Sequence, residues 1–476
     1  MRIGIAVLLG MEAVVAAELR RMGYEEEAIS SRDGMVYLTT GDDRGTVSRD
    51  IARLNIGLRA GERVFLEVGH GSAPDFDELF ILTSSLAWNE FCPQGYFIHI
   101  ERGYSRRSRL EGVPACQAII KKAIVRSVLR ARNMPETARL EEDPLKGRIR
   151  VHFAIIDDEC SLLIDTSGVG LHKRGYRIRN TMAPLRESLA AGMLLLARRE
   201  ELGGMNSDEA IWDPFCGGGT IPIEAALILS NTAPGLDRSF AGEEWPYLDP
   251  AAFKTARAEA LAAIVQEPPE RPMIIGSDID VGVLEHARFH AERAGVEDWI
   301  DWRVLDATEL KPKYIHKQTG MERCLVMANP PWGERLMQAA AVEEIYRNLT
   351  RNLFTEGVGA AGIRLYLFTA DEDFETVVGY RADQRRKLYN GMVRCTLFQY
   401  YRQYPQEIRA RRPSRPRRER PLGTASAKGG GKRPSGAAPG VERGARRPSG
   451  TVPGAVRNRR RPENRRNNNN RSRTSR

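Results

Sequence analysis

Residues 213–222 read DPFCGGGTIP and are the most informative segment of the sequence. It begins at the end of a strand expected over 210–213 and leads into a helix expected over 221–229. Three successive glycines, 217–219, let the backbone come close to a ligand, and the start of the next helix offers free N–H groups to an anionic end such as a carboxylate. The stretch therefore predicts a ligand-binding turn; a tight strand-to-helix connection without a ligand is the alternative.

Strands and helices alternate around this loop. No GKS or GKT follows the glycines and this loop does not match GxGxxG, so it is neither a Walker loop nor a dinucleotide fingerprint. Alternation of this length implies a parallel sheet covered by helices on both faces. Further strands are expected at 273–278, 301–305, 323–328, 363–369 and 393–401, and helices at 188–200, 282–294 and 341–354.

Acidic residues end the next two strands of the predicted sheet. GSDID, residues 276–280, places Asp278 where a carboxylate can accept hydrogen bonds from ribose hydroxyls, and Asp280 is expected to cap the following helix. Asp306 ends the third strand and could accept a hydrogen bond from an adenine amine. Capping of a loop is the alternative for Asp278 and for Asp306. The glycine turn and these two acidic strand ends, three features at successive strand ends, predict a nucleoside-containing ligand.

The fourth strand ends in ANPPWG, residues 328–333. Two prolines in succession end the strand and lock φ, which suits a rigid site. The side chain of Asn329 and a proline carbonyl can accept the two N–H bonds of a base amine, and Trp332 can stack on a flipped base. The motif therefore predicts transfer of a methyl group from a sulfonium to an exocyclic amine; a packed strand terminator is the alternative.

Charge is distributed unevenly along the 476 residues. The chain carries a net charge of +10, but residues 403–476 alone hold 22 Lys/Arg and 4 Asp/Glu, so the rest is mildly acidic. The C-terminal segment has few large apolar residues and is predicted to be a disordered basic tail.

Six scattered cysteines indicate reduced thiols. No run approaches the roughly 20 apolar residues of a membrane span, so a soluble cytoplasmic protein without a bound metal is expected.

Taken together, DPFCGGGTIPIEAAL, GSDID, the Asp306-Ala307 pair and NPPWGERL resemble the THUMP-containing RNA methyltransferases, above all those that form N2-methylguanosine in bacterial large-subunit rRNA or in tRNA. The likeness covers roughly residues 1–402, including GMEAVVAAELRRMGY, GLHKRGYR and RRKLYNGMVRC. The motif's fourth position is more often Tyr or Phe in this family, so Trp332 keeps stacking but can alter the size of the pocket.

The resemblance implies a fold and a set of site residues. The fold is an α/β class I (Rossmann-like) methyltransferase domain over 167–402, preceded by a ferredoxin-like domain at 1–61 and a THUMP RNA-binding domain at 62–166, with the tail at 403–476. The cofactor is S-adenosyl-L-methionine and the partner is RNA. Asn329, Pro330, Pro331 and Trp332 would hold the target base. The cofactor would contact Asp213, Pro214, Phe215, Gly217, Gly219, Thr220, Asp278, Ile279, Asp306 and Ala307.

Basic residues between 96 and 190 suggest where RNA is held. This segment has 18 Lys/Arg against 11 Asp/Glu within an acidic body. A solvated charged face is the alternative for any single one of them. The predicted phosphate contacts are Arg106, Arg107, Lys121, Lys122, Arg126, Lys173, Arg174 and Arg177.

Several other functions fit part of the pattern. A DNA adenine methyltransferase shares the loop and NPPW but has no reason to carry the N-terminal half. A thiouridine-forming THUMP enzyme needs an SGGxDS-like loop, which is absent. Cys216 and Cys324 could suggest C5 methylation, whose chemistry does not need Asn-Pro-Pro. An RNA-binding protein without activity also remains. Among RNA substrates the sequence favours 23S rRNA over tRNA, and oligomeric state is not predicted.

Overall fold

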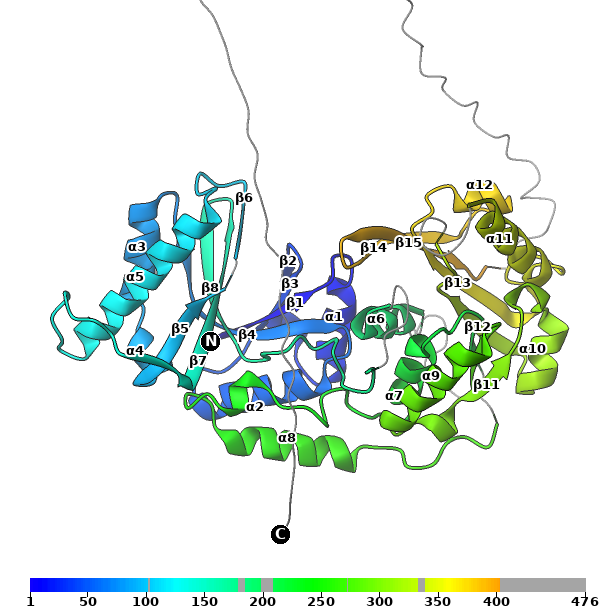
Figure 1. The fold of residues 1–476 in the computed structure, drawn as a ribbon, viewed down its shortest axis with the longest axis horizontal. Helices are drawn as coiled ribbons and strands as arrows, with labels where there is room; N and C mark the ends of the chain where they lie inside the picture. The colour runs from blue at the N-terminus through cyan, green and yellow to red at the C-terminus, as the bar shows by residue number, and fades with distance from the viewer. Residues whose placement is uncertain (102, 179–184, 198–208, 272, 333–338, 403–476) are drawn as a thin grey trace, which may run out of the picture. The chain divides into compact units, whose positions relative to one another are not determined.

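The computed structural model describes residues 1–402 except 102, 179–184, 198–208, 272 and 333–338 (Figure 1). The predicted basic tail, residues 198–200 of one expected helix and Gly333 lie outside the described residues. The described residues fold around two β-sheets, each built from one half of the chain. No helix among them is long and apolar enough to cross a membrane.

The N-terminal half forms an eight-stranded sheet in the order β2-β3-β1-β4-β8-β7-β5, with β6 paired to β7. Its strands are β1 (Arg2–Val7), β2 (Ile29–Arg32), β3 (Met35–Thr39), β4 (Gly61–Ser72), β5 (Gly95–Ile100), β6 (Tyr104–Arg106), β7 (Glu142–Ile156) and β8 (Glu159–Asp165). The helices of this half are α1 (Glu12–Arg21), α2 (Arg44–Gly57), α3 (Phe76–Ser85), α4 (Trp88–Phe91) and α5 (Val113–Ala131).

One long strand joins the two predicted N-terminal domains. The first part of β4 pairs with β1 and its second part with β8, so the expected boundary at residues 61/62 falls where a shared strand begins. The acidic hairpin turn between β7 and β8 has positive φ at both Asp157 and Asp158, as a two-residue type I′ turn requires. The turn fixes the register of β7 against β8.

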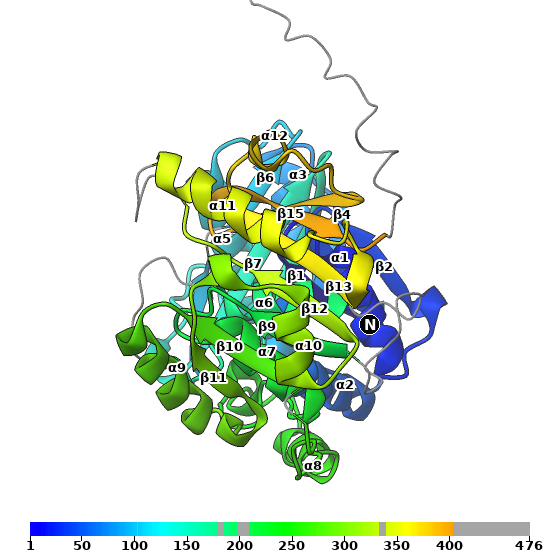
Figure 2. The ribbon, with the colours of Figure 1, turned by 90° about the vertical axis from the view of Figure 1, so that its right-hand side faces the viewer.

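The C-terminal half forms a seven-stranded sheet in the order β11-β10-β9-β12-β13-β15-β14 (Figure 2). Strands β11 to β13 are parallel, and β15 and β14 complete the sheet antiparallel. The strands are β9 (Glu209–Asp213), β10 (Ile274–Asp278), β11 (Asp301–Val304), β12 (Arg323–Ala328), β13 (Ile363–Thr369), β14 (Gln384–Asn390) and β15 (Val393–Tyr400). The helices are α6 (Glu187–Ala197), α7 (Thr220–Leu229), α8 (Pro250–Ala262), α9 (Val281–Arg293), α10 (Pro312–Thr319), α11 (Ala339–Leu353) and α12 (Phe374–Val378).

Helices cover both faces of this second sheet. A Cβ at Gly276 of β10 would lie 3.2 Å from Pro222 of α7, whereas Trp212 of β9, which is in register with the residue before Gly276, packs its ring 5.9 Å from that of Tyr314 in α10. Neighbouring residues of a strand point to opposite faces, so α7 and α10 lie on opposite sides. The expected doubly covered parallel sheet is confirmed.

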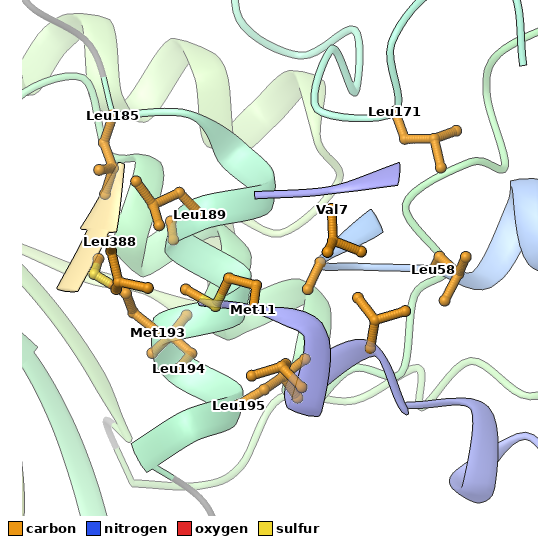
Figure 3. Packing of buried hydrophobic residues seen from close by; sticks show 14 of the residues in the cluster. Val7, Met11, Leu58, Leu171, Leu185, Leu189, Met193, Leu194, Leu195 and Leu388 are labelled. Atoms are coloured by element: carbon orange, nitrogen blue, oxygen red, sulfur yellow. The ribbon is translucent and has the colours of Figure 1, made fainter. Parts of the chain in front are cut away.

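The two halves share a hydrophobic core. Met11, just before α1, lies against α6, where a Cβ at Gly192 would be only 2.8 Å from its sulfur. Figure 3 shows Met11 beside Leu189 and Met193 of α6, with Leu388 of β14 close by. Arg386 of β14 also donates to the carbonyl of Gly10 (3.0 Å). The edge of the second sheet is therefore attached to the first.

Candidate active site

The strand order of the second sheet changes direction beside β9. Strand β10 lies on one side of it and β12 on the other, and all three are parallel, so their carboxyl ends meet at one edge. That edge carries Asp213, Asp278 and Asn329 at the ends of β9, β10 and β12. A crevice at such a switch point is where open α/β sheets bind ligands. The fold thus brings together three of the predicted site residues.

A buried carboxylate, that of Asp213, lies where β9 ends and the glycine loop begins. Asp213 is 1% exposed and accepts the N–H of Phe215 (3.0 Å). Burial, with repulsion from Asp278 as a smaller cause, raises the pKa of Asp213 well above its usual value. Gly217 and Gly219 have φ of +50° and +84°, the left-handed region that glycine adopts without a Cβ penalty. Glycine is therefore required by the backbone here as well as by any ligand.

Backbone bonds hold the loop onto β10. Gly217 donates its N–H to Asp278 (3.0 Å), and Cys216 donates to the carbonyl of Ser277 (3.0 Å). On the other side, His290 of α9 is fully buried with Nδ1 2.9 Å from the Gly218 carbonyl. A carbonyl only accepts, so Nδ1 carries the hydrogen of that bond. His290 is not among the predicted site residues, because in the sequence only its spacing within α9 could have pointed to it.

Both strand-end aspartates also act as loop caps. Asp278 accepts the N–H of Asp280 (3.1 Å), and Asp306 accepts from the N–H (2.8 Å) and hydroxyl (2.7 Å) of Thr308. The capping alternative thus holds for each, although a carboxylate has about four acceptor positions and capping fills only part of them. Asp280 caps α9 by accepting from Gly282 (2.8 Å), as predicted.

The Asn-Pro-Pro-Trp turn leaves β12 beside this loop. Among the described residues, Asn329 Oδ1 and Trp332 Nε1 are buried atoms without a hydrogen-bond partner. The Trp332 ring packs edge-on against Phe368 of β13, 6.0 Å between centroids. A buried acceptor left unpaired costs about 1–3 kcal/mol, which a ligand that donates an N–H removes. The turn therefore offers an acceptor and an aromatic wall to a planar amine.

The loop fits the methionine end of a methyl donor. A Cβ built at Gly217 meets nothing within 4 Å, whereas one at Gly219 would lie 2.9 Å from Trp302 and 3.1 Å from Ala287. The space beside Gly219 is thus occupied by other side chains of the protein, while the space beside Gly217 is open for a ligand. Nearby, Thr220 begins α7, Ile279 is 68% exposed and Ala307 is buried. Pro214 and Phe215 lie in the same loop.

The predicted RNA contacts separate into two groups. Arg106, Lys122 and Lys173 are exposed, as are Arg107 and Arg126, although Arg107 pairs with Asp157 (2.6 Å) and Arg126 with Glu136 (2.8 Å). The remaining three are bonded to partners within the protein.

The prediction of RNA contact needs correction for Lys121, Arg174 and Arg177. Lys121 donates to the Ile98 carbonyl (2.6 Å) and pairs with Glu142, and Arg174 is buried against Glu224 (3.4 Å). Arg177 contacts Glu187 (2.9 Å), the Leu185 carbonyl (2.8 Å) and Thr220 (3.4 Å). Charge spacing along the sequence does not distinguish a cation that pairs internally from one that faces solvent.

The strand order and the paired glycine and Asn-Pro-Pro-Trp turns define a class I methyltransferase. Residues 174–399 match the RMKL-like methyltransferase domain, and residues 5–65 match the RlmL ferredoxin-like domain. YpsC of Bacillus subtilis, named as an RNA methyltransferase, is 35% identical over 83% of this chain and 94% of its own length. The chain therefore belongs to the family of RMKL-like RNA methyltransferases, and its cofactor is S-adenosylmethionine.

Other relatives are longer or differently named. The ribosomal RNA large subunit methyltransferase K/L of Syntrophotalea carbinolica is 30% identical over 82% of this chain, which spans about half (52%) of that protein. The crystal structure of SMU.472, a methyltransferase in complex with S-adenosylhomocysteine, matches with a TM-score of 0.71, 33% identity and coverage of 85% and 99%. A Listeria monocytogenes protein, described as a predicted N6-adenine-specific DNA methylase, matches with a TM-score of 0.69 and 37% identity. The match covers 84% of this chain and 96% of that protein.

Proposed function

We propose that this protein methylates the exocyclic N2 amine of a guanine in 23S rRNA. The observation that carries the proposal is the buried Oδ1 of Asn329 at the switch point of the sheet, which has no hydrogen-bond partner within the described part of the chain. An exocyclic amine supplies the N–H donor that this oxygen lacks, and the likeness to the K/L enzymes supports rRNA as the substrate. Such a substrate would be met in the cytoplasm.

The residues of the turn have separate tasks. Asn329 Oδ1 and the Pro330 carbonyl accept the two amine hydrogens, which directs the nitrogen lone pair out of the plane of the base. Trp332 stacks on the base, and Phe368 supports its ring from the side. S-adenosylmethionine supplies an electrophilic methyl group on a sulfonium. No strong base is needed, because the amine becomes acidic when it gains the methyl group.

We propose further that residues 62–166 are a THUMP module that binds the RNA. The segment contributes nearly all of β4 and all of β5 to β8 to the first sheet, and its helices are α3, α4 and α5. Lys122 and Arg126 of α5 are exposed and both lie over the ring of Phe80, at 5.8 and 5.7 Å. Cations arranged in this way on one helix face suit phosphate contact. Lys173 and Arg106 would add to it.

The competing chemistries are less well supported. Burial raises the pKa of both Cys216 and Cys324, so neither thiol is a ready nucleophile for C5 methylation. A tRNA guanine is the first alternative, because the turn would hold the same amine. The likeness to the Listeria protein keeps adenine N6 as another, since the turn accepts any planar amine. A non-catalytic RNA-binding protein would not need the acceptor of Asn329.

Nucleoside mass spectrometry of a strain lacking the gene tests the proposal. Total tRNA and 23S rRNA are separated, and the expected result is loss of N2-methylguanosine from 23S rRNA alone, restored by the wild-type gene but not by Asn329→Ala. Loss of N2-methylguanosine from tRNA would make tRNA the substrate in place of 23S rRNA. Loss of N6-methyladenosine would overturn the assignment of guanine. Unchanged nucleosides in both pools would overturn the enzymatic proposal.

A further inference from the structure

The Asn-Pro-Pro-Trp turn has an unusual deficit of backbone donors. Pro330 and Pro331 have no N–H, so the turn can be held through its carbonyl oxygens but not through its own donors at these positions. Proline also locks φ at both residues, which leaves ψ of Pro331 as the soft torsion before Trp332. Whatever fixes the Pro331 carbonyl therefore fixes the direction in which Trp332 leaves the turn.

The Pro331 carbonyl faces a tyrosine from another element. The hydroxyl of Tyr346, in α11, lies 3.4 Å from the Pro331 oxygen and 3.0 Å from Oγ1 of Thr369, the last residue of β13. Thr369 Oγ1 in turn accepts the N–H of Asp371 (3.1 Å). The side chains of Tyr346 and Thr369 are both fully buried.

The hydrogens that these groups carry fix the donor and the acceptor in each of the three hydrogen bonds. The Pro331 carbonyl only accepts, so the single hydrogen of Tyr346 must go to it. The Thr369 hydroxyl then donates to the Tyr346 oxygen, while its own oxygen accepts from Asp371. Burial raises the pKa of Tyr346 to about 12, so the hydroxyl remains a donor at neutral pH. All three contacts are satisfied in one arrangement.

The tyrosine ring is itself held in place. It packs edge-on against Phe374, 5.1 Å between centroids, and Phe374 packs against Phe398 of β15 (4.9 Å). Removing the hydroxyl alone therefore leaves the ring where it is. The residue before Thr369 is Phe368, which supports Trp332, so the end of β13 holds the turn at two successive residues.

We infer that Tyr346 is a positioning residue, which sets ψ of Pro331 and through it the orientation of Trp332 toward the target base, with Thr369 orienting the tyrosine. The role rests on the proposed function for its effect on catalysis. Its structural part, the orientation of Trp332, does not depend on the substrate. A misplacement of about 1 Å near a reacting group can cost on the order of 100-fold in rate.

The test compares Tyr346→Phe and Thr369→Val with a matched control. Tyr400 is also fully buried, and its hydroxyl donates to a carbonyl, that of Tyr380 (3.1 Å), so Tyr400→Phe removes the same kind of bond elsewhere. Activity is measured as steady-state initial rates with 23S rRNA as the substrate. Tyr346→Phe is expected to lower kcat about tenfold or more, with KM for S-adenosylmethionine unchanged. Tyr400→Phe is expected to lower Tm without changing kcat.

Two further readouts separate positioning from general weakening. If both residues act through one chain, the double variant Tyr346→Phe/Thr369→Val is no slower than Tyr346→Phe within about twofold. Without RNA, the near-UV circular dichroism of Trp332, obtained by subtracting Trp332→Phe in each background, is expected to weaken in Tyr346→Phe. Unchanged kcat and unchanged dichroism would overturn the inference, as would fully additive losses. A wild-type protein inactive on RNA whose Trp332 signal still responds would overturn the proposed function and support the positioning role.

Discussion

Arg174 lies 3.4 Å from Glu224 of α7, and both side chains are buried, 3% and 0% exposed. The arginine also donates to the carbonyls of Leu171 (2.5 Å) and Arg59, so one side chain connects the first half of the chain, the segment before α6 and the helix that begins at the cofactor loop. Tyr176 adds a bond from its hydroxyl to Glu224 (3.1 Å). The task of Arg174 in this fold is mechanical support of α7.

Replacing Arg174 by Met should destabilise the protein without changing its affinity for RNA. The substitution leaves Glu224 buried without its cation, which costs about 3–5 kcal/mol. Urea unfolding measures the change, and filter binding below the unfolding temperature measures affinity. The matched control is Lys173→Met at the exposed neighbouring position, which should keep stability and weaken RNA binding. A stable Arg174→Met protein with weak RNA binding would contradict this assignment.

The neighbouring pair offers a second check on the same cause. If an uncompensated carboxylate is what destabilises Arg174→Met, the double variant Arg174→Met/Glu224→Met should regain much of the loss, because both charges are then gone. Equal stability of the single and double variants would show that the lost arginine bonds to the two carbonyls matter more.

The residues at the carboxyl edge of the second sheet could be predicted from the sequence, because each of them lies at the end of one recognisable strand. Strand ends of a parallel sheet must meet at one edge, so Asp213, Asp278 and Asn329 come together once the strands are identified. The strands β9 to β13 have the short apolar runs that indicate them. The sequence did not point to His290 or Tyr346, because their bonds to Gly218, 72 residues away, and to Pro331, 15 residues away, depend on tertiary packing.

Other elements left weak signals. Helix α8 was missed because only Phe253 and Ala256 of it are buried, so it shows little apolar periodicity. Strand β14 was missed because QRRKLYN carries its buried Leu388 among polar residues at the edge of the sheet. Buried and exposed arginines look alike in sequence, since burial depends on a partner such as Glu224, which is 50 residues away from Arg174.

Asn329→Ala should abolish most methyl transfer while leaving the cofactor in place. The amide oxygen is the acceptor for the amine, and losing one such group costs about 10²–10³-fold in rate. Single-turnover transfer to RNA gives the rate, and calorimetry gives the affinity for S-adenosylmethionine, which should not change. Asn89→Ala, at an exposed position, is the control. A parallel fall in both quantities would indicate that Asn329 holds the cofactor and not the base.

Alanine substitutions at the two loop glycines, Gly217 and Gly219, should impair the protein for different reasons. Gly217→Ala adds a methyl group into open space, so the protein should lose only about 1–2 kcal/mol for its positive φ, yet bind the methyl donor at least ~10-fold more weakly. Gly219→Ala pushes a methyl group against Trp302 and should lose about 2–4 kcal/mol. Thermal unfolding and calorimetry separate the two. Unchanged donor affinity in Gly217→Ala would place the donor elsewhere.

Asp213→Asn should become progressively more stable than the wild type as pH rises. Burial raises the pKa of Asp213 above 3.8, so the folded state favours the protonated form. The stability linked to this proton is fully present below the unfolded-state pKa and is lost as pH rises through the folded-state pKa. Asparagine keeps the acceptor for the Phe215 N–H and carries no charge, so it escapes this loss. The difference in free energy of unfolding is measured by urea titration from pH 4 upward.

Asp43→Asn provides a control with the opposite sign. The Asp43 carboxylate caps α2 by accepting the Thr46 N–H (2.8 Å), and this bond and one from the Thr46 side chain lower its pKa. A lowered pKa contributes stability above the unfolded-state value that is lost as pH falls through the folded-state one, so Asp43→Asn should lose ground against the wild type as pH rises. The two difference curves must therefore diverge. A flat curve for Asp213→Asn would mean that the pKa of Asp213 is the same in the folded and unfolded states, which would contradict the raised pKa of the buried carboxyl.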